Sequence, residues 1–465
     1  MGVRGDAPAL HLPDKTLDYA SLRNRVAGLA ASLQDFGLTP SATIALLTES
    51  TSFIALMAHA APLIGCTLFP LDPKLPPAWR NRLLEQAGVD AVLCDEADDT
   101  YPPLLKVYRI GSLPTQMAPF ATKDVLSPGV QLIVASSGSS AKPRGGMLSP
   151  ANLDASVKSA NERLDLRLGD CWLDCLPLFH IGGLAILFRA SAAGASVVLH
   201  QGFDAVTVWA DLQWHSVTHL SLVPAMLAKL LDVANERPPP ETLRVVLVGG
   251  AHLNSHLAKR ALDSGWPLCV SYGLSETSSQ VATRCLAQRS EVEPGNVGKP
   301  LHGFEVRVAD ETGRPTTGVG WIHIRGKAVM VGYANPEHRP GDGLDDGWLV
   351  SGDLGQLDES GRLTIVGRAD EVLVSGGENI HPLQVEDLIM DCSAVDEVVV
   401  IGKADPVWGE RIVAIYSGTI DVNELQRWCR THIRGALRPR EFIRRKSFPR
   451  LTNGKVDRKR VRECG

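Results

Sequence analysis

Residues 130–146 read VQLIVASSGSSAKPRGG, a short apolar run followed directly by a loop of glycine and hydroxyl residues. The apolar run has the length of a buried strand. Glycine and small hydroxyl residues let a backbone approach a polyphosphate closely. The loop lacks the GxxxxGK[ST] pattern of a Walker A motif. It is therefore either a phosphate-binding loop of another kind or a flexible Ser/Gly segment.

Helical and strand patterns alternate on both sides of this loop. Apolar residues recur every three or four positions over residues 19–36, which is typical of an amphipathic helix, and residues 43–47 (TIALL) form an apolar strand pattern. The same alternation continues through residues 51–94 and returns over residues 195–271. It predicts an α/β fold with mostly parallel sheets covered by helices.

The pattern changes after about residue 295. Short alternating strands separated by turns such as DETGR and DESGR predict a β-rich subdomain. Beyond residue 368, a strand–helix–strand–strand–helix pattern predicts a small α+β domain large enough to fold alone. The expected division is an N-terminal domain of residues 1–368, a hinge at 369–371 and a mobile C-terminal domain of residues 372–465.

Composition excludes several classes of protein. The 465 residues carry 47 Lys and Arg against 52 Asp and Glu, a net charge of −5, which argues against a general affinity for nucleic acid. The longest apolar stretch, residues 53–69, is interrupted by His59, Pro62 and Gly65 and is too short to span a bilayer comfortably. The first residues lack an apolar signal core, so we expect a cytoplasmic protein. The nine cysteines contain no CxxC pair and predict reduced core thiols.

Further motifs strengthen the phosphate-binding interpretation. They are YGLSET (272–277), GWLVSGD (347–353), GRADEVLVSGGENIH (367–381) and LTNGK, which ends at Lys455. Together with the loop, their order and spacing resemble the signature motifs of adenylate-forming enzymes, which include acyl-CoA synthetases, peptide-synthetase adenylation domains and luciferases. The resemblance extends from HLPDKTLDYASL (11–22) to Lys455. It implies an ATP-dependent acid–thiol ligase that forms an acyl-adenylate and then a thioester.

The resemblance also implies a set of nucleotide-binding residues. Tyr272 would stack on adenine, Glu276 would ligate Mg²⁺, and Asp353 would accept hydrogen bonds from both ribose hydroxyls. Two loop residues depart from the family pattern: Ala141 replaces a glycine, and Arg144 replaces a lysine but keeps its charge. The full expected set is Ser136, Ser137, Gly138, Ser139, Ser140, Lys142, Arg144, Gly249, Gly250, Ala251, Tyr272, Gly273, Ser275, Glu276, Asp353 and Arg368.

The catalytic residues implied by the resemblance are Lys455, His180, Glu276 and Arg368. Lys455 would reach the α-phosphate and the substrate carboxylate during adenylation. From the residues alone, without the motif, a solvated lysine of the tail is the preferred interpretation. His180, in LPLFHIGGL, would border the acyl pocket and the thiol entry, with a core histidine as the alternative.

The second half-reaction has its own expected residues. Asp370 matches the family hinge, about which the C-terminal domain rotates between half-reactions. Gly376 and Gly377 would leave room for the pantetheine of coenzyme A. Trp408 is either a platform for coenzyme A or a packing residue. The implied cofactors are therefore ATP, Mg²⁺ and coenzyme A.

The acid is suggested by two further stretches. PLFHIGGLAILFRASAAGASVVLHQGFD (177–204) and SYGLSETSSQVAT (271–283) resemble 2-succinylbenzoate–CoA ligases of menaquinone biosynthesis, while residues 367–382 also resemble benzoate-type CoA ligases. A dicarboxylic substrate needs a cation for its second carboxylate, and Arg189 could supply one. Alternatively, Arg189 lies at the rim of a surface helix. Gly182 replaces a serine found in some succinylbenzoate ligases.

Other interpretations remain open at this stage. The thiol could belong to a carrier protein, the acid could be another small carboxylic acid, or the chain could be a silent binding scaffold. Retention of Glu276, Asp353, Arg368 and Lys455 argues against the scaffold. The expected partners are a carboxylic acid, ATP and coenzyme A, and a homodimer is compatible with this interpretation.

Two remaining patterns were also interpreted. The HxxxH pairs His215/His219 and His252/His256 lack a third ligand, so we expect surface residues. The basic tail, residues 427–462, is expected to face the phosphates of ATP and coenzyme A.

Overall fold

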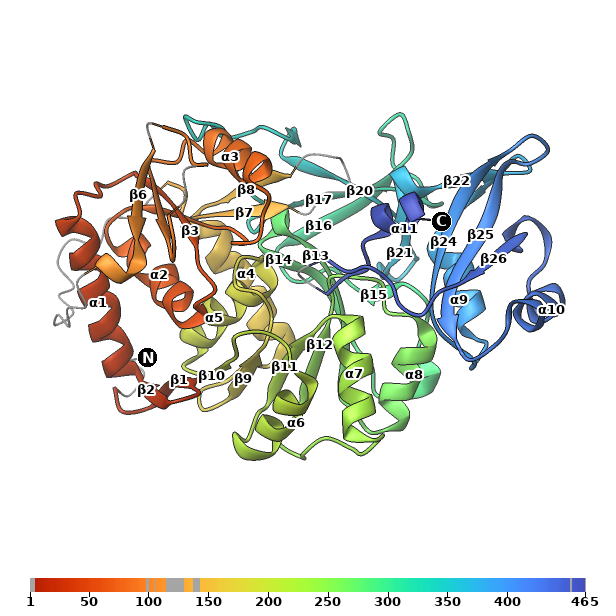
Figure 1. The fold of residues 1–465 in the computed structure, drawn as a ribbon, viewed down its shortest axis with the longest axis horizontal. Helices are drawn as coiled ribbons and strands as arrows, with labels where there is room; N and C mark the ends of the chain where they lie inside the picture. The colour runs from red at the N-terminus through yellow and green to blue at the C-terminus, as the bar shows by residue number, and fades with distance from the viewer. Residues whose placement is uncertain are drawn as a thin grey trace.

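Two mostly parallel sheets covered by helices form the body of the N-terminal part of the chain (Figure 1). The computed structural model describes residues 5–97, 100–103, 105–113, 129–136, 143–451 and 454–464. The first sheet runs in spatial order through β14 (Ser279–Cys285), β13 (Leu268–Leu274), β12 (Val245–Val248), β11 (His219–Leu222), β9 (Cys171–Asp174), β10 (Ser196–Leu199), β1 (Pro8–Leu12) and β2 (Lys15–Asp18). Only its edge strands β14 and β2 pair antiparallel with their neighbours. The expected α/β class is confirmed.

The second sheet contains the strand that leads into the small-residue loop. Its order is β18 (Gly332–Tyr333), β8 (Arg144–Leu148), β7 (Leu132–Ser136), β4 (Thr67–Pro70), β3 (Thr43–Leu47), β5 (Ala91–Cys94) and β6 (Lys106–Arg109). The strand expected at residues 130–135 is β7. The chain returns antiparallel as β8, and Ser136 pairs with Arg144. The two ends of the loop therefore lie side by side at this edge of β7.

The helices over these sheets begin where their sequences supply caps. The Asp18 carboxylate accepts a hydrogen bond from the Ser21 amide at 2.6 Å, and Ser149 and Asn152 form a reciprocal capping box. The helices are α1 (Tyr19–Asp35), α2 (Thr51–Leu63), α3 (Pro77–Gln86), α4 (Pro150–Leu164), α5 (Ile181–Ala193), α6 (Ala205–Trp214), α7 (Pro224–Ala234) and α8 (Ser255–Asp263). In the described ranges, none of the helices is both long and apolar enough to cross a membrane.

The β-rich segment forms a third sheet, which is antiparallel throughout. It runs through β15 (Asn296–Gly298), β21 (Leu363–Arg368), β20 (Trp348–Leu357), β17 (Gly320–Gly326) and β16 (Phe304–Ala309), and β19 (Leu344–Asp345) also pairs with β20. The Gly and Asp turns that separate these strands allow the chain to reverse direction between neighbours. The sheet ends at Arg368, from which the short helix η4 (Ala369–Glu371) leads to the C-terminal part.

The C-terminal part has its own sheet and its own core, on the blue side of Figure 1. The sheet contains β23 (Glu378–Ile380), β22 (Leu373–Ser375), β25 (Gly409–Gly418) and β24 (Val395–Asp405), and β26 (Glu441–Arg444) pairs parallel with β25. The helices are α9 (Pro382–Met390), α10 (Val422–His432) and α11 (Arg458–Cys464). Val385 and Ile389 of α9 pack on Val400, Ile412 and Tyr416 in a core separate from that of the N-terminal sheets.

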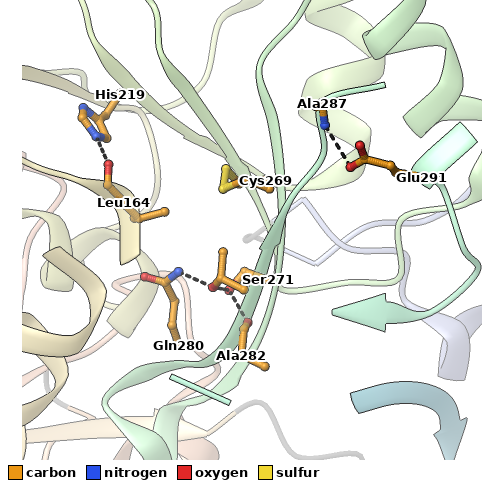
Figure 2. Close-up of a disulfide and its surroundings, with 10 residues drawn as sticks. Leu164, His219, Cys269, Ser271, Gln280, Ala282, Ala287 and Glu291 are labelled. Atoms are coloured by element: carbon orange, nitrogen blue, oxygen red, sulfur yellow. Dashed lines mark hydrogen bonds between the residues drawn. A yellow bond between two sulfur atoms is a disulfide. The ribbon is translucent and has the colours of Figure 1, made fainter. Parts of the chain in front are cut away.

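Cys269 and Cys285 form a disulfide bond between β13 and β14 (Figure 2). The prediction that the cysteines are reduced core thiols is wrong for this pair. The two residues are direct partners in the antiparallel register, with Cα atoms 3.8 Å apart. Their proximity depends on the register of a hairpin, which spacing along the sequence does not reveal. Six further cysteines are buried and form no disulfide in the described residues: Cys66, Cys94, Cys171, Cys175, Cys392 and Cys429.

Candidate functional site

A cleft of about 1660 Å³ lies where the parallel sheets, the antiparallel sheet and the C-terminal segment meet. It brings together most of the expected site residues that the structure describes. Those lining it are Ser136, Arg144, His180, Gly182, Arg189, Gly249, Gly250, Ala251, Tyr272, Gly273, Ser275, Glu276, Asp353, Arg368, Asp370 and Lys455. The expected loop residues Ser137, Gly138, Ser139, Ser140 and Lys142, and the departure at Ala141, lie outside the described residues.

Asp353 is the centre of a hydrogen-bonded group within the cleft. The Tyr272 hydroxyl donates to Asp353 Oδ2 at 2.8 Å, and Arg368 Nη1 donates to Asp353 Oδ1 at 3.1 Å. Asp353 on β20 stands directly opposite Arg368 on β21, so strand pairing sets this contact. Burial, with the nearby Asp353 charge, raises the pKa of Tyr272 well above its usual value, so the phenol keeps the proton it donates. The carboxylate is thereby fixed in position to accept hydrogen bonds from a diol such as ribose.

Gly273 shows why the chain beside Tyr272 is so tightly constrained. The β13–β14 hairpin brings Gly273 so close to Ser279 that a Cβ atom would lie 1.9 Å from the Ser279 carbonyl oxygen. No larger residue fits without moving the backbone. This close approach holds the segment from Tyr272 to Glu276 along the wall of the cleft.

Glu276 is a buried carboxylate next to the strands that flank the loop. It belongs to the short helix η2 (Ser275–Thr277), and its side chain accepts a hydrogen bond from the Tyr333 hydroxyl at 3.0 Å. The Arg144 guanidinium lies 3.7 Å from the centre of the Tyr333 ring and forms an ion pair with Asp342 at 2.9 Å. Arg144 thus lines the cleft while it is paired with Asp342.

The donor set at Glu276 fits Mg²⁺ in combination with a nucleotide. Throughout the described ranges, no three His, Cys, Asp or Glu side chains gather to hold a metal ion. Mg²⁺ is usually bound by one or two carboxylates together with substrate phosphates and water. An ionised carboxylate that accepts one hydrogen bond from Tyr333 still has lone pairs for a cation. Glu276 therefore suits an ion shared with the phosphates of ATP.

Lys455 enters the cleft from the C-terminal segment and lies against the turn that follows β12. A Cβ atom on Gly250 would lie 3.3 Å from Lys455 Cε, and Gly250 has a positive φ of 78°. Both the conformation and the close approach therefore favour glycine. Burial lowers the pKa of Lys455, with the Asp353 carboxylate opposing the shift. Lys455 thus lines the cleft and does not extend from the tail into solvent.

His180 occupies the N-cap position of α5, at the edge of the same cleft. Burial lowers the pKa of His180 to about 4, the Lys455 charge adds to the effect, and Asp72 opposes it. The imidazole is therefore neutral near pH 7. A neutral imidazole has one donor and one acceptor nitrogen, which suits it to orient a polar ligand.

Arg189 lies on the buried side of α5, with only 1% of its surface exposed, and it lines the cleft. Its Nε and Nη2 atoms have no hydrogen-bond partner among the described residues, and its guanidinium lies 5.8 Å from the centre of the Trp172 ring. Burial lowers the pKa of Arg189 to about 10, so the group is still cationic at neutral pH. The alternative of an arginine on the rim of a surface helix is excluded. A buried cation without a partner is unfavourable, which makes this end of the cleft suited to an anion.

Gln280 and Gly182 also line the cleft. Gln280 was not predicted from the sequence; its Oε1 lacks a partner in the described part of the chain, while its Nε2 donates to Thr283 Oγ1 at 2.7 Å. At Gly182, an added Cβ atom would meet only Leu176 Cδ1, at an ordinary 3.5 Å. A serine would therefore fit at this position without strain.

The residues expected to serve coenzyme A lie together outside the cleft. Gly376, Gly377 and Trp408 are not among its lining residues. The Gly376 amide donates to the Trp408 carbonyl at 2.9 Å, and the Arg440 guanidinium lies 4.1 Å from the Trp408 ring. Asp370 in η4 accepts a hydrogen bond from Arg368 at 3.2 Å. In this orientation of the C-terminal part, Lys455 occupies the cleft and the glycine pair does not.

The structure corrects the interpretation of the HxxxH pairs. His219 is fully buried, with its Nε2 3.0 Å from the Leu164 carbonyl, because it begins the central strand β11. His252 is largely buried against Asp387. The prediction of surface residues is therefore wrong for both. His256 is exposed and His215 is partly exposed.

Several cations of the basic tail line the cleft, namely Arg450, Lys455, Arg458, Lys459, Arg460 and Arg462, and Arg450 and Arg458 among them also pair with nearby carboxylates. Arg458 pairs with Glu386 and Glu371, and Arg450 pairs with Glu397. Ion pairs between side chains far apart in the sequence leave no local pattern. These two arginines therefore line the cleft while they are held by carboxylates, beside Lys455.

Comparisons with known proteins agree with this geometry. Residues 2–334 match the model of the AMP-binding enzyme family, and residues 384–455 match that of the AMP-binding enzyme C-terminal domain. The chain is 30% identical to a 2-succinylbenzoate–CoA ligase of Bacillus mycoides (strain KBAB4), over 98% of this chain and 96% of that protein. It is 33% identical to the corresponding ligase of Bacillus pumilus (strain SAFR-032), over 100% of this chain and 96% of that protein.

Solved structures of an o-succinylbenzoate CoA synthetase are also similar to this chain. The o-succinylbenzoate CoA synthetase of Bacillus subtilis in complex with its acyl-adenylate intermediate superimposes with a TM-score of 0.88 at 29% identity, covering 98% of this chain and 95% of that one. Its complex with ATP and a magnesium ion gives a TM-score of 0.88 at 30% identity, covering 98% and 97%. With the family model matched over most of its length, the chain belongs to the AMP-binding enzymes.

Proposed function

We propose that this chain is an AMP-forming acid–CoA ligase whose acid is 2-succinylbenzoate or another aromatic dicarboxylate. The observation that carries the choice of acid is the buried guanidinium of Arg189, two of whose nitrogens have no hydrogen-bond partner in the described residues. It lies in the cleft that also contains Tyr272, Asp353 and Lys455. The relatives named as 2-succinylbenzoate–CoA ligases, and the structure with that acyl-adenylate, support the same substrate.

In the first half-reaction, an oxygen of the substrate carboxylate attacks the α-phosphorus of ATP. The bond to the bridging oxygen breaks, and pyrophosphate leaves with its electron pair. Tyr272, Asp353 and Arg368 hold the adenosine, and Lys455 offsets the charge of the two anions that must approach each other. Glu276 would hold Mg²⁺, which neutralises phosphate charge when bound.

In the second half-reaction, the thiolate of coenzyme A attacks the acyl carbon and AMP leaves as the phosphate anion. The proposal assigns Gly376, Gly377 and Trp408 to coenzyme A, and Asp370 to the hinge that brings them to the cleft. Neutral His180 lies at the acyl end and is assigned to orient the carbonyl or the incoming thiol. The cytoplasm is the proposed location, because it supplies both ATP and coenzyme A.

The acyl pocket explains why a second carboxylate would be selected. Arg189 is buried and cationic, and it lacks a partner in the described residues, so an anionic group on the far end of the acid would satisfy it. A monocarboxylic acid would leave the buried Arg189 cation without an anion in the loaded pocket, which binding sites with buried polar groups disfavour strongly.

A substrate pair separates the role of Arg189 from general damage to the enzyme. 2-Succinylbenzoate and 3-benzoylpropionate share the carboxylate that is activated, and only the first has a ring carboxylate. Pyrophosphate release with each acid, with and without coenzyme A, gives kcat/KM for both. We expect the wild type to prefer the dicarboxylate by about 10- to 100-fold, as a charged hydrogen bond is worth roughly 1.5–3 kcal/mol.

Arg189→Met keeps the apolar length of the side chain and removes its charge. It should abolish most of that preference by lowering kcat/KM for the dicarboxylate while sparing the monocarboxylate. An unchanged preference in Arg189→Met would contradict the assigned role. Release of pyrophosphate without any stimulation by coenzyme A would favour a carrier-protein thiol as acceptor, and no turnover with any acid would contradict the ligase itself.

A further inference from the structure

One buried ion pair joins the N-terminal body to the C-terminal part at the edge of the cleft. His252 follows the turn after β12, and Asp387 lies on α9 (Figure 1 shows α8, which begins just after His252, beside α9). His252 Nε2 lies 3.0 Å from Asp387 Oδ1 and 2.9 Å from Oδ2. The side chains are only 16% and 12% exposed, so solvent and salt screen the pair weakly.

His252, the member of this pair from the N-terminal body, is close in sequence to the glycine that the Lys455 side chain contacts. His252 lies two residues after Gly250, the residue against which the Lys455 side chain rests. A shift of His252 would therefore move the turn that forms one wall around the lysine.

Asp387, the member of the pair from the C-terminal part, is linked to the segment of Lys455 through its neighbour on α9. Glu386, the neighbour of Asp387 on α9, binds Arg458 through both guanidinium nitrogens, at 3.1 and 2.7 Å. Arg458 lies three residues after Lys455 in the chain. One helix thus holds the segment that contains Lys455 through Glu386, and holds the N-terminal body through Asp387.

We propose that His252 and Asp387 are a positioning pair, an interdomain latch that holds Lys455 in the cleft for adenylation and opens before thioester formation. The proposal rests on the two half-reactions proposed above. With Gly376 and Gly377 outside the cleft, the second half-reaction requires the C-terminal part to move, and α9 cannot leave without breaking this contact.

The charges around His252 make the latch sensitive to pH. The charged groups acting on it are Asp387 and Glu386 from α9 and Arg458 from the segment after Lys455. Burial works to lower the pKa of His252, but the hydrogen bond and charge of Asp387 outweigh it, with Glu386 adding to them and Arg458 opposing, so the pKa is raised. The imidazolium form, and with it the charged latch, is present below this raised pKa and is lost as pH rises through it.

The test separates the half-reactions in His252→Ala and Asp387→Asn. Because a hydrogen-bonded charge pair is worth roughly 1.5–3 kcal/mol, we expect acyl-adenylate formation to fall by about tenfold or more in both variants. Thioester formation from supplied acyl-adenylate and coenzyme A should be unchanged or faster. His256→Ala, an exposed histidine four residues further along, is the matched control and should behave as wild type.

Three further measurements distinguish a latch from a folding defect. The thermal midpoint shows whether each variant is folded, and Asp387→Glu should restore part of the adenylation rate. The adenylation rate of the wild type should decline as pH rises through the pKa of His252, a step that His252→Ala should lack. Equal losses in both half-reactions, or an unchanged pH profile in His252→Ala, would overturn the latch.

A distance measurement that requires no turnover tests the latch even if the proposed acid is wrong. Fluorophores attached to α6 and α10 report the distance between the two parts of the chain in the presence of ATP alone. The latch predicts a broader or longer distance distribution in His252→Ala than in His256→Ala. Identical distributions would overturn the latch, whereas failure of every acid in the turnover assay would contradict only the proposed function.

Discussion

Lys455 belongs to the C-terminal part of the chain, yet its side chain lies against a turn of the N-terminal body. It rests on Gly250, and burial lowers its pKa while Asp353 partly opposes that shift. A lysine that must be cationic in a site where its charged form is disfavoured is poised for an anion. ATP and the substrate carboxylate supply that anion in the proposed reaction.

Replacement of Lys455 by alanine should separate the half-reactions. We expect acyl-adenylate formation to fall by about 10²–10³-fold, the usual cost of removing one preorganised group that stabilises developing charge. Thioester formation from supplied acyl-adenylate should change little. Because its pKa is lowered, Lys455 loses its proton at a lower pH than a solvated lysine, so adenylation should decline as pH rises through that pKa. Comparable losses in both half-reactions would contradict the assignment.

The sequence identified the site residues that belong to ordered motifs. It did not identify the residues that only the folded chain brings together. Tyr272, Glu276, Asp353 and Lys455 line one cleft, as their motifs predicted. The hydroxyl of Tyr333 on Glu276 joins residues 57 positions apart, with no motif to connect them. Gln280 and the His252–Asp387 pair were missed for the same reason, since hydrogen bonding and burial depend on tertiary neighbours.

The β13–β14 hairpin is the element where prediction and structure differ most. Alternation of strand and helix predicted β13, yet it could not specify which residue of β14 stands opposite Cys269. The register places Cys285 there, as a disulfide partner. The same hairpin contains Tyr272 and Gly273 and leads to Glu276, so the bond closes the element that supplies the nucleotide wall of the cleft.

This disulfide predicts a definite thiol content. Two of the nine cysteines are paired, so denatured protein purified without reductant should expose seven reactive thiols, rising to nine after reduction. The bond closes a loop with a sequence separation of 16, worth about 3 kcal/mol in the chain-entropy estimate. Cys285→Ser should therefore lower the thermal midpoint in oxidising buffer and have a much smaller effect in reducing buffer. Nine thiols before reduction would contradict the pairing.

At the scale of the whole molecule, the pattern of apolar residues was a good guide to architecture. Parallel sheets, the antiparallel sheet after residue 295 and a separate C-terminal core all follow from local periodicity and turn residues. The relative placement of these parts does not, because it depends on contacts such as Tyr272–Asp353 and His252–Asp387 that join distant segments. The net charge of −5 likewise gave no hint that arginines of the tail pair within their own domain.

The position of Gly376, Gly377 and Trp408 outside the cleft has a consequence for the order of substrates. Lys455 and the glycine pair need the same opening at different times, so coenzyme A should act only after pyrophosphate has left. Initial rates measured against ATP at several concentrations of coenzyme A should then give parallel double-reciprocal lines. Intersecting lines would show instead that all substrates assemble before any product departs. Between pyrophosphate release and the attack by coenzyme A, the enzyme holds a reactive mixed anhydride. The movement of the C-terminal part must therefore be faster than the hydrolysis of this intermediate.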